Sequence, residues 1–451
     1  MARGGKVVAH LGLDDTDSPR GGCTTYIAAI LVEEFCQLGV DFLDYPNLVR
    51  LNPNAPWKTR GNGAVCLRFS CEPELLDEVL ARAVELVERE ADLAFEETHP
   101  GVALLAGEVP LELRLFAKRA IRGLVSLEEA LKLCARLDVR AVGFKLGRGL
   151  AGALAAIGEP LAGDHTYELL AYRTPENRGK PRAVDASSVV AMDEATRPLT
   201  FNNYDLGTGR VLITPHGPDP VLLGIRGEAP EVVLKAFRML KLGEPVERWA
   251  IFRTNQGTDA HLARRLVREL RPYLPAVVRG RVASVPVMLP GGHVVFRLSD
   301  GSGQVDCAAF RPSGRLAKVA HALWPGDLVE VAGGVKTGPQ GQLTLNIEKL
   351  VVLELAEKRL PRNPRCPRCG KRMKSMGTGK GFRCPRCGHR DPKAQKEWVL
   401  VPRDVRPGLY LPPPRSQRHL TKPLRRYGLE KYGLPGPPRG EWHWPCWRGS
   451  A

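Results

Sequence analysis

Residues 10–25, HLGLDDTDSPRGGCTT, connect a predicted strand to a predicted helix and organise the rest of the chain. The residues around 7–13 are apolar and favour a strand, and residues 26–38 form an apolar helix that ends before Gly39. Three carboxylates lie where the strand ends: Asp14, Asp15 and Asp17. Carboxylates hold magnesium, and the free N–H groups of a helix start receive phosphate. This stretch is therefore typical of a nucleotide–metal site.

A second polar stretch, KTRGNG at residues 58–63, precedes a predicted strand at residues 64–69. Lys58, Arg60 and Asn62 stand beside two glycines, a composition that suits close approach to phosphate oxygens. A polar hairpin turn is the more common explanation of such a string when it stands alone. Its pairing with the acids of the first loop favours a phosphate-contacting loop.

The charge of the chain is concentrated at one end. The 451 residues carry a net charge of +17, and residues 361–451 hold 22 Lys and Arg against 5 Asp and Glu, so residues 1–360 balance. This placement predicts a segment that binds a polyanion. The alternative is a solvated, disordered basic tail.

Hydropathy and cysteine usage exclude two broad classes of protein. The sequence has no apolar run of the roughly 18 residues that a membrane span needs, and its start, MARGGKVVAH, has no apolar signal core. The eleven cysteines are odd in number, and seven of them are scattered singly, so we do not expect a disulfide framework. We expect a cytoplasmic protein without a membrane partner.

Residues 139–275 mix short predicted strands and helices. Strands are expected at residues 167–172, 211–213, 221–225 and 249–253, and helices at residues 151–157, 231–242 and 260–270. This mixture favours an α+β sandwich of ferredoxin type. Thr258 or Asp259 either caps the last helix or lines a polar pocket.

Residues 276–355 are predicted to be all-β. About five strands, with a helix at residues 316–323 between the third and fourth, follow the order of an OB-fold. Such barrels bind single-stranded nucleic acid with aromatic side chains and a basic groove. Phe296, Phe310 and Trp324 are either stacking platforms or core residues.

Two CxxC motifs 14 residues apart give the strongest local signal. Cys366, Cys369, Cys384 and Cys387 predict a four-thiolate zinc ribbon, with an iron–sulfur centre as the alternative. Arginines and lysines surround the cysteines, so we expect the ribbon to contact a nucleic-acid backbone.

The last segment, residues 393–451, is rich in Pro, Arg and Trp. Its three terminal tryptophans, at 442, 444 and 447, either stack on unpaired bases or pin the tail onto a domain. His443 and Cys446 are too isolated a pair to predict a metal site.

Taken together, these motifs resemble one family. The stretches GLDDTDSPRGGCTTY, LVRLNPNAPWKTRGNGAV, GRGLAGALAAIG, ELLAYR and LLGIRGE, followed by an OB-fold and a zinc ribbon, closely resemble the archaeal tRNA(Ile) 2-agmatinylcytidine synthetases. The resemblance covers nearly the whole chain. It implies a multidomain α+β protein with a kinase-like α/β domain at residues 1–138, a ferredoxin-like domain at 139–275, an OB-fold β-barrel at 276–355, a zinc ribbon at 361–392 and a tail at 393–451.

The resemblance also implies an activity. Members of that family use ATP and agmatine to convert the wobble cytidine of an isoleucine tRNA with a CAU anticodon into agmatidine, so that the tRNA reads AUA. They cleave ATP to AMP and use its γ-phosphate to activate the cytosine carbon-2 oxygen, which the agmatine amine then displaces. The first two domains form the active site, and the OB-fold and ribbon hold the tRNA.

Motif positions assign the expected site residues. Asp14, Asp15 and Asp17 are expected to hold magnesium and phosphates, with Asp14 and Asp15 as the magnesium ligands. Thr24 matches the threonine for which the family's kinase domain is named. The residues that we expect to contact ATP are Gly21, Gly22, Lys58, Arg60 and Asn62. The alternative for the acids is a solvated cap of the following helix.

Agmatine is a dication, so its pocket needs carboxylates, and we expect Asp164 and Asp259 to supply them. Two other functions stay open. Residues 276–451 alone would describe a non-catalytic protein that binds single-stranded nucleic acid. A tRNA-modifying ligase that uses another amine is the second alternative.

Overall fold

The opening stretch forms the central strand of the N-terminal sheet. In the computed structural model, which describes residues 5–338, 340–434 and 436–445, β1 (Val7–Asp14) lies antiparallel to both β4 (Gly63–Cys71) and β5 (Gly101–Ala106). β3 (Asn47–Arg50) and β6 (Arg140–Gly143) extend the sheet in the order β6-β5-β1-β4-β3, and β2 (Asp41–Phe42) also pairs with β4.

Helices cover both faces of this sheet. α1 (Thr24–Gln37) and α2 (Leu75–Glu90) pack on Leu11 and Leu13 in one core, and α3 (Leu111–Arg122), α4 (Leu127–Arg136) and α5 (Gly149–Gly158) build the other. Because side chains alternate along a strand, Gly12 faces α5, where an added Cβ would stand 2.3 Å from the carbonyl oxygen of Ala153. α5 therefore packs directly on the backbone of β1.

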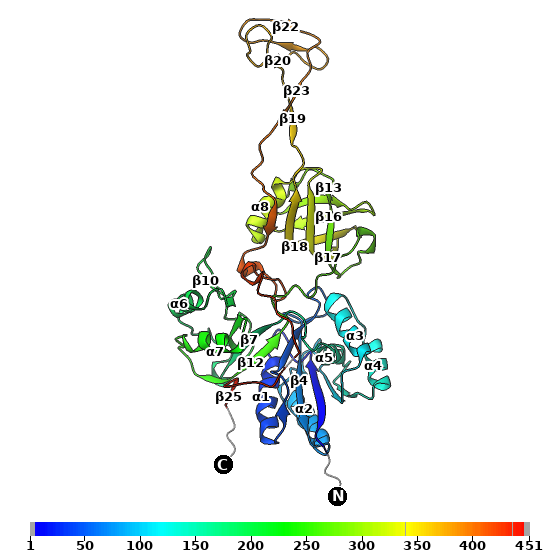
Figure 1. Cartoon of the computed structure of the whole chain (residues 1–451), viewed down its shortest axis with the longest axis vertical. Helices are drawn as coiled ribbons and strands as arrows, with labels where there is room; N and C mark the ends of the chain where they lie inside the picture. Colours follow the sequence, from blue (N-terminus) through cyan, green and yellow to red (C-terminus); the bar gives the residue numbers. More distant parts are fainter. Residues whose placement is uncertain (1–4, 339, 435, 446–451) are drawn as a thin grey trace.

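The second unit continues the same sheet. Its βαββαβ order consists of β7 (Thr166–Arg173), α6 (Ala186–Thr196), β8 (Thr200–Phe201), β11 (Val221–Gly227), α7 (Pro230–Arg238) and β12 (Val246–Thr254). The strand order β12-β7-β11-β8 confirms the predicted ferredoxin-like arrangement. β12 also pairs in parallel with β3, so the two units share one twisted sheet (Figure 1). A short hairpin, β9 (Tyr204–Asp205) and β10 (Arg210–Val211), projects from it.

One predicted helix is wrong. Residues 260–270 contain only the 3₁₀ turn η2 (Val267–Glu269). Asp259 has a φ of +60°, and the N–H of Arg265 donates to the carbonyl of Val277 instead of to a helical partner. These residues lie along β13 (Pro275–Val282), so Thr258 and Asp259 cap no α-helix.

The boundary that we predict at residue 138 stays a prediction. β6, beyond it, pairs with β5, and α5 packs on β1, β4 and β5 of the first unit. The contacts of the first unit therefore continue to about the end of α5.

The OB-fold is a closed barrel, as predicted. Its strands are β13, β15 (Val294–Ser299), β16 (Gln304–Ala309), β17 (Leu328–Thr337) and β18 (Leu343–Glu354), in the order β13-β17-β18-β16-β15, and β13 closes onto β15. α8 (Arg315–Ala322) lies between β16 and β17, and β14 (Val287–Met288) extends β15. Phe296 is a core residue, whereas Phe310 is 42% exposed.

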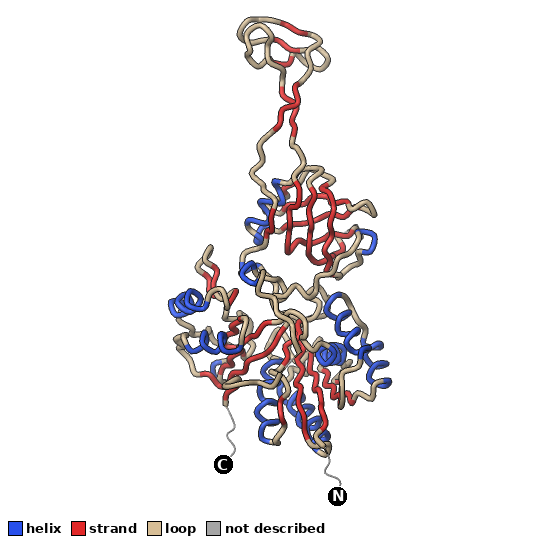
Figure 2. Tube along the Cα trace, viewed as in Figure 1, coloured by secondary structure: helices blue, strands red, loops and turns tan. Residues whose placement is uncertain are grey.

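The zinc ribbon stands at the far end of the molecule on a narrow stalk (Figure 1). The stalk pairs β19 (Arg359–Arg362) with β23 (Glu397–Leu400), and the ribbon contains β20 (Lys374–Ser375), β21 (Phe382–Arg383) and β22 (Arg390–Asp391). Figure 2 shows that most of the ribbon is loop. Its core holds only Cys366, Met373, Phe382 and Cys384, with two partly buried neighbours.

After the ribbon the chain returns along the whole molecule. β24 (Gly408–Tyr410) pairs with β18 of the barrel, and β25 (His443–Trp444) pairs with β12 at the other end, near the N-terminus (Figure 1). Trp442 packs edge-to-face against Phe42, with ring centroids 5.4 Å apart. For Trp442, therefore, the tail is pinned onto a domain. Cys446 and Trp447 lie outside the described residues.

Four other 3₁₀ turns complete the secondary structure: η1 (Pro175–Asn177), η3 (Arg311–Ser313), η4 (Pro414–Ser416) and η5 (Leu424–Arg426). Across the described part of the chain, every helix is too short or too polar to cross a membrane.

Candidate active site

A cavity of about 840 Å³ opens where the N-terminal unit meets the ferredoxin-like unit. Its wall includes the end of β1, the start of α1, the loop at residues 58–63, the start of α5, and parts of β7 and β11. The sequence-predicted residues that line it are Asp14, Asp15, Asp17, Thr24, Lys58, Arg60 and Asn62. Gly21, Gly22, Asp164 and Asp259 are not in its wall.

Asp14 ends β1 and faces the first turn of α5. A Cβ at Gly152 would stand 1.7 Å from Oδ2 of Asp14, so only glycine at this helix position leaves room for the carboxylate. Burial, with the neighbouring charge of Asp15, raises the pKa of Asp14 well above its ordinary value. The carboxylate is thus held in a tight, desolvated position that a bound cation would stabilise.

Asp15 and Asp17 are held by different parts of the first unit. Asp15 adopts a φ of +60°, and its Oδ2 accepts a hydrogen bond from the His99 backbone N–H at 3.1 Å. Burial raises the pKa of Asp15 to about 7. Asp17 accepts a hydrogen bond from the Thr59 hydroxyl at 2.7 Å, which joins the acidic loop to the loop at residues 58–63.

Thr24 is the first residue of α1 and is 6% exposed. Its Oγ1 lies 2.9 Å from Oγ1 of Thr16, within the acidic loop. No acidic side chain occupies the first turn of this 14-residue helix, and no side chain caps its N-terminus. Its free N–H groups and dipole therefore favour an anion beside Thr24.

Arg60 ties the two loops together. Its Nη2 donates to the carbonyls of Ser18 and Gly21 at 2.9 and 3.3 Å, and its Nη1 lies 3.5 Å from Oδ2 of Asp219. Lys58 donates to the Arg60 carbonyl, and the Asn62 amide donates to the carbonyl of Asn52 at 2.8 Å. Both Arg60 and Asn62 have positive φ, so this loop adopts a tight, unusual backbone path.

Gly22 supports this arrangement from behind. It has a φ of +75°, and an added Cβ would stand 2.6 Å from the carbonyl oxygen of Thr16. Gly21 accepts the hydrogen bond from Arg60. Both glycines therefore shape the acidic loop, while their predicted contact with ATP stays a prediction.

Sequence reasoning missed a charged cluster on the floor of the cavity. Glu168 of β7 is buried and accepts a hydrogen bond from Nε of Arg226 at 2.9 Å, with Nη2 of Arg50 at 3.9 Å. His419, from the returning C-terminal segment, also lines the wall. Glu168 and Arg226 lie within the ELLAYR and LLGIRGE stretches, but nothing local predicts that they meet, because the pairing of β7 with β11 brings them together.

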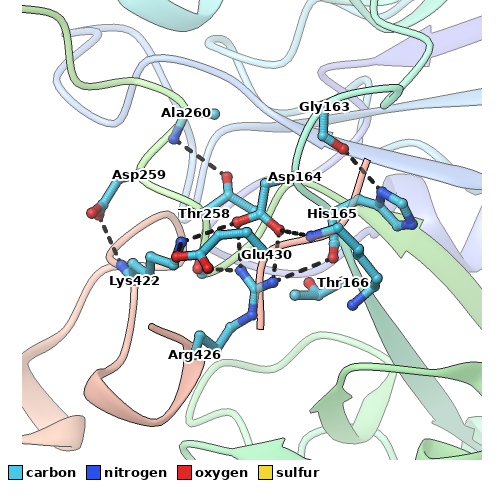
Figure 3. Close-up of polar contacts among 12 residues, drawn as sticks. Gly163, Asp164, His165, Thr166, Thr258, Asp259, Ala260, Lys422, Arg426 and Glu430 are labelled. Carbon is cyan, nitrogen blue, oxygen red and sulfur yellow. Dashed lines mark hydrogen bonds and ion pairs between the residues drawn. The ribbon is translucent and has the colours of Figure 1, made fainter. Parts of the chain in front are cut away.

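Asp164 and Asp259 are engaged elsewhere (Figure 3). Asp164 pairs with Arg426 at 2.9 Å and with Lys422 at 3.3 Å. Asp259 pairs with Lys349 and accepts a hydrogen bond from the Lys422 N–H. Both carboxylates already have cationic or N–H partners from within the protein, and this position gives no reason to retain them as agmatine ligands.

The four ribbon cysteines fit a zinc ion. Their Sγ atoms all lie within 4.8 Å of one another, with Cys366 and Cys387 at 3.5 Å and Cys369 and Cys384 at 3.4 Å. A tetrahedral site with Zn–S bonds of about 2.3 Å has sulfurs about 3.8 Å apart. Among the described residues this is the one cluster of three or more metal-binding side chains, so the carboxylates of Asp14, Asp15 and Asp17 do not converge in that way.

Comparison with known families decides the affiliation. Residues 10–146 match the TiaS TCKD domain, residues 147–261 the TiaS FLD domain and residues 363–405 the TiaS C-terminal zinc ribbon domain. The chain belongs to the TiaS family. A further match, at residues 276–353, is to an OB-fold nucleic acid binding domain, so the predicted family and the predicted succession of folds are both confirmed.

Full-length relatives support the TiaS assignment. The tRNA(Ile) 2-agmatinylcytidine synthetase TiaS of Staphylothermus marinus is 45% identical over 451 residues, covering 95% of this chain and 96% of that protein. A solved complex of TiaS with its isoleucine tRNA and ATP is 40% identical with a TM-score of 0.84, and a solved complex with the tRNA, AMPCPP and agmatine is 38% identical with a TM-score of 0.81. Both comparisons cover 93% of this chain and 97% of the solved one.

Proposed function

We propose that this protein uses ATP to join agmatine to the wobble cytidine of an isoleucine tRNA with a CAU anticodon, so that the tRNA reads AUA. The observation that carries the proposal is the convergence of the acidic loop, Thr24 and the loop at residues 58–63 on one cavity. The match to TiaS along nearly the whole chain names the substrates.

The chemistry explains why this cavity needs both acids and cations. The carbon-2 oxygen of cytosine is a poor leaving group for an amine, and phosphorylation makes it a good one. Phosphoryl transfer depends on positioning and on charge stabilisation more than on covalent chemistry. Lys58 and Arg60 provide positive charge on one side, and the N–H groups beside Thr24 provide a second anion-binding position. ATP is cleaved to AMP, with the γ-phosphate as the activating group.

Magnesium is part of this proposal. Mg²⁺ in nucleotide sites is usually held by one or two carboxylates together with substrate phosphates. Asp14 and Asp15 suit that role, because burial raises the pKa of both carboxyls and a cation would favour their ionised forms. The ion would neutralise phosphate charge during transfer. Zinc in the ribbon would be structural, because four thiolates leave no open position.

The tRNA reaches the cavity from the other modules. The OB-fold and the ribbon provide an extended surface away from the cavity, and the wobble base has to leave its stack to enter the site (Figure 1). Agmatine is a dication, and the cavity wall offers four aspartates for it and the metal: Asp14, Asp15, Asp17 and Asp219. Since its substrate is a tRNA, we also propose a cytoplasmic location.

The decisive experiment incubates the protein with ATP, radiolabelled agmatine and the isoleucine tRNA with a CAU anticodon. We expect label on the wobble cytidine and AMP as the nucleotide product. Tight tRNA binding without label would favour the non-catalytic nucleic-acid binding protein. Label from lysine instead of agmatine would establish a ligase that uses another amine.

Variants of Thr24 and Asp15 connect that activity to this cavity. Thr24→Ala and Asp15→Asn are expected to abolish modification while tRNA affinity stays within a few-fold, because both residues lie in the cavity wall and outside the OB-fold and ribbon. Thr24→Ser keeps the hydroxyl and is the matched control, expected to retain most of the activity. Loss of thermal stability in both inactive variants would make their roles structural.

A further inference from the structure

The C-terminal return segment, residues 415–431, delivers one side chain to the wall of the cavity. His419 lies against the loop at residues 58–63: a Cβ at Gly61 would stand 2.7 Å from Cδ2 and 2.8 Å from Nε2 of the ring. The glycine in KTRGNG therefore leaves the space that the imidazole occupies. Its neighbour Arg418 holds Oδ1 of Asn54 at 2.6 Å, which fixes the backbone beside the ring.

The hydrogen bonds of His419 orient its two nitrogens differently. Nδ1 lies 3.0 Å from Nη2 of Arg226 and 2.9 Å from Oε1 of Gln256. A neutral Nδ1 satisfies only one of these contacts. A guanidinium donates and never accepts, and a charged donor forms the stronger bond. We therefore assign Nδ1 as the acceptor of the Arg226 hydrogen bond, which places the ring proton on Nε2.

The second nitrogen is available to a ligand. Among the described residues no hydrogen-bond partner is found for Nε2, and the ring is partly exposed where it lines the cavity. Burial, followed by the charges of Arg50, Arg226 and Lys58, lowers the pKa of His419 well below its ordinary value, so the ring is neutral at pH 7. The ring thus presents a fixed, uncharged N–H.

The surroundings of His419 define the chemistry of the ligand. Arg50, Arg226 and Lys58 all line the cavity beside it, and the nearby carboxylate, Glu168, is already engaged by Arg226 and Gln256. A wall with three cations and an N–H donor favours an oxyanion over an amine. This wall lies opposite in character to the aspartates that end β1.

We propose that His419 is a substrate-contacting residue whose Nε2–H donates a hydrogen bond to a phosphate oxygen. The inference rests on the proposed function, in which both ATP and the tRNA backbone bring phosphate to the cavity. The ribbon and the return segment are one continuous polypeptide, so a residue that follows the tRNA-binding modules in sequence completes the wall of the catalytic cavity.

Two amide substitutions separate the roles of the two nitrogens. His419→Gln places an amide near the position of Nε2, and His419→Asn places one near Nδ1. The measurements are KM for ATP, KM for tRNA and kcat in the agmatine-labelling assay, with equilibrium binding of ATP and of tRNA measured separately. The control is His321→Asn, a substitution of an exposed histidine on α8 outside the cavity.

We expect His419→Asn to raise KM and Kd for one of the two phosphate substrates about tenfold, as the loss of one charge-assisted hydrogen bond predicts. His419→Gln should recover most of that loss. The substrate whose KM and Kd change identifies the source of the phosphate. If His419→Asn binds both substrates like the unsubstituted protein, or if the Gln variant is no better than the Asn variant, the proposal is overturned.

Failure of the proposed function is recognised separately. An unsubstituted protein that transfers no label refutes that function, while the binding measurements still test His419. A fall in thermal midpoint confined to the His419 variants, with unchanged substrate affinity at a temperature where they stay folded, would make the histidine purely structural and would also overturn the proposal.

Discussion

The zinc ribbon and the return segment are both strongly basic, yet they use their charge in opposite ways. In the ribbon, six basic side chains are exposed, and no ion pair is found for any of them in the described structure: Arg365, Arg368, Lys371, Arg383, Arg386 and Arg390. In the return segment, residues 415–431, basic side chains face carboxylates of other elements. Those partners include Asp205, Glu348, Asp164, Asp193 and Glu228.

The difference shows what a charge census does and does not measure. The sequence excess in the last fifth of the chain predicts one polyanion-binding tail, but only the ribbon presents its cations to solvent. The cations of the return segment neutralise partly or fully buried acids and fasten the segment to the ferredoxin-like unit (Figure 3). An internal ion pair costs desolvation and is unavailable to RNA.

The largest difference between the two regions should appear in stability. Arg426 is fully buried, and its guanidinium lies 2.9 Å from Asp164 and 2.5 Å from Glu228. Arg426→Met leaves two carboxylates without their partner, so we expect a loss of about 3–5 kcal/mol in the free energy of unfolding. Urea denaturation measures it. Arg386→Met in the ribbon is the control, expected to change stability by less than about 0.5 kcal/mol. Equal losses would refute the contrast.

Zinc removal tests the ribbon in the other direction. Its few buried side chains cannot maintain the fold without a metal. We expect Cys384→Ser to lose zinc, to expose the ribbon to protease and to weaken tRNA binding about tenfold or more, while ATP binding in the distant cavity is unchanged. Metal analysis and filter binding measure these effects. Unchanged tRNA affinity in a zinc-free variant would show that the ribbon does not hold tRNA.

Salt dependence distinguishes solvated cations from paired ones. We expect Arg368→Gln with Arg386→Gln to reduce the slope of log affinity for tRNA against log salt by up to about two, with a several-fold loss of affinity. Arg415→Gln, in the return segment, removes a cation that is paired with Asp205 at 2.7 Å and should leave the slope unchanged. A slope that falls equally in both variants would show that the return segment also contacts phosphate.

The smallest effect concerns pH. The hydrogen bond from Lys422 lowers the pKa of Glu430 from 4.5 to about 2. A carboxyl with a depressed folded-state pKa stabilises the fold above its unfolded pKa and loses that contribution as pH falls through the folded value. Glu430→Gln should therefore lower the urea midpoint slightly at pH 7, and the difference from the unsubstituted protein should vanish between pH 4.5 and about 2. A difference that persists below the folded-state pKa would contradict this assignment.

Local patterns were enough to predict several parts of the molecule. The CxxC pairs predict a ribbon because four thiolates at that spacing fit one tetrahedral ion. The alternating strands at residues 276–355 predict a barrel, and the DDTD loop predicts acids at the end of a strand. Each signal depends on residues close in sequence, and the structure brings Asp14, Asp15, Asp17 and Thr24 to one cavity as expected.

The tertiary structure alone decided the rest. Asp164 and Asp259 look available in the sequence, but the return segment neutralises one and Lys349 of the barrel pairs with the other. The helix expected at residues 260–270 is replaced by contacts with β13, because an adjacent strand offers its backbone other partners. Arg50, Glu168, Arg226 and His419 meet from four separate segments. Such convergence depends on strand pairing and on the path of the returning chain, which no local pattern contains.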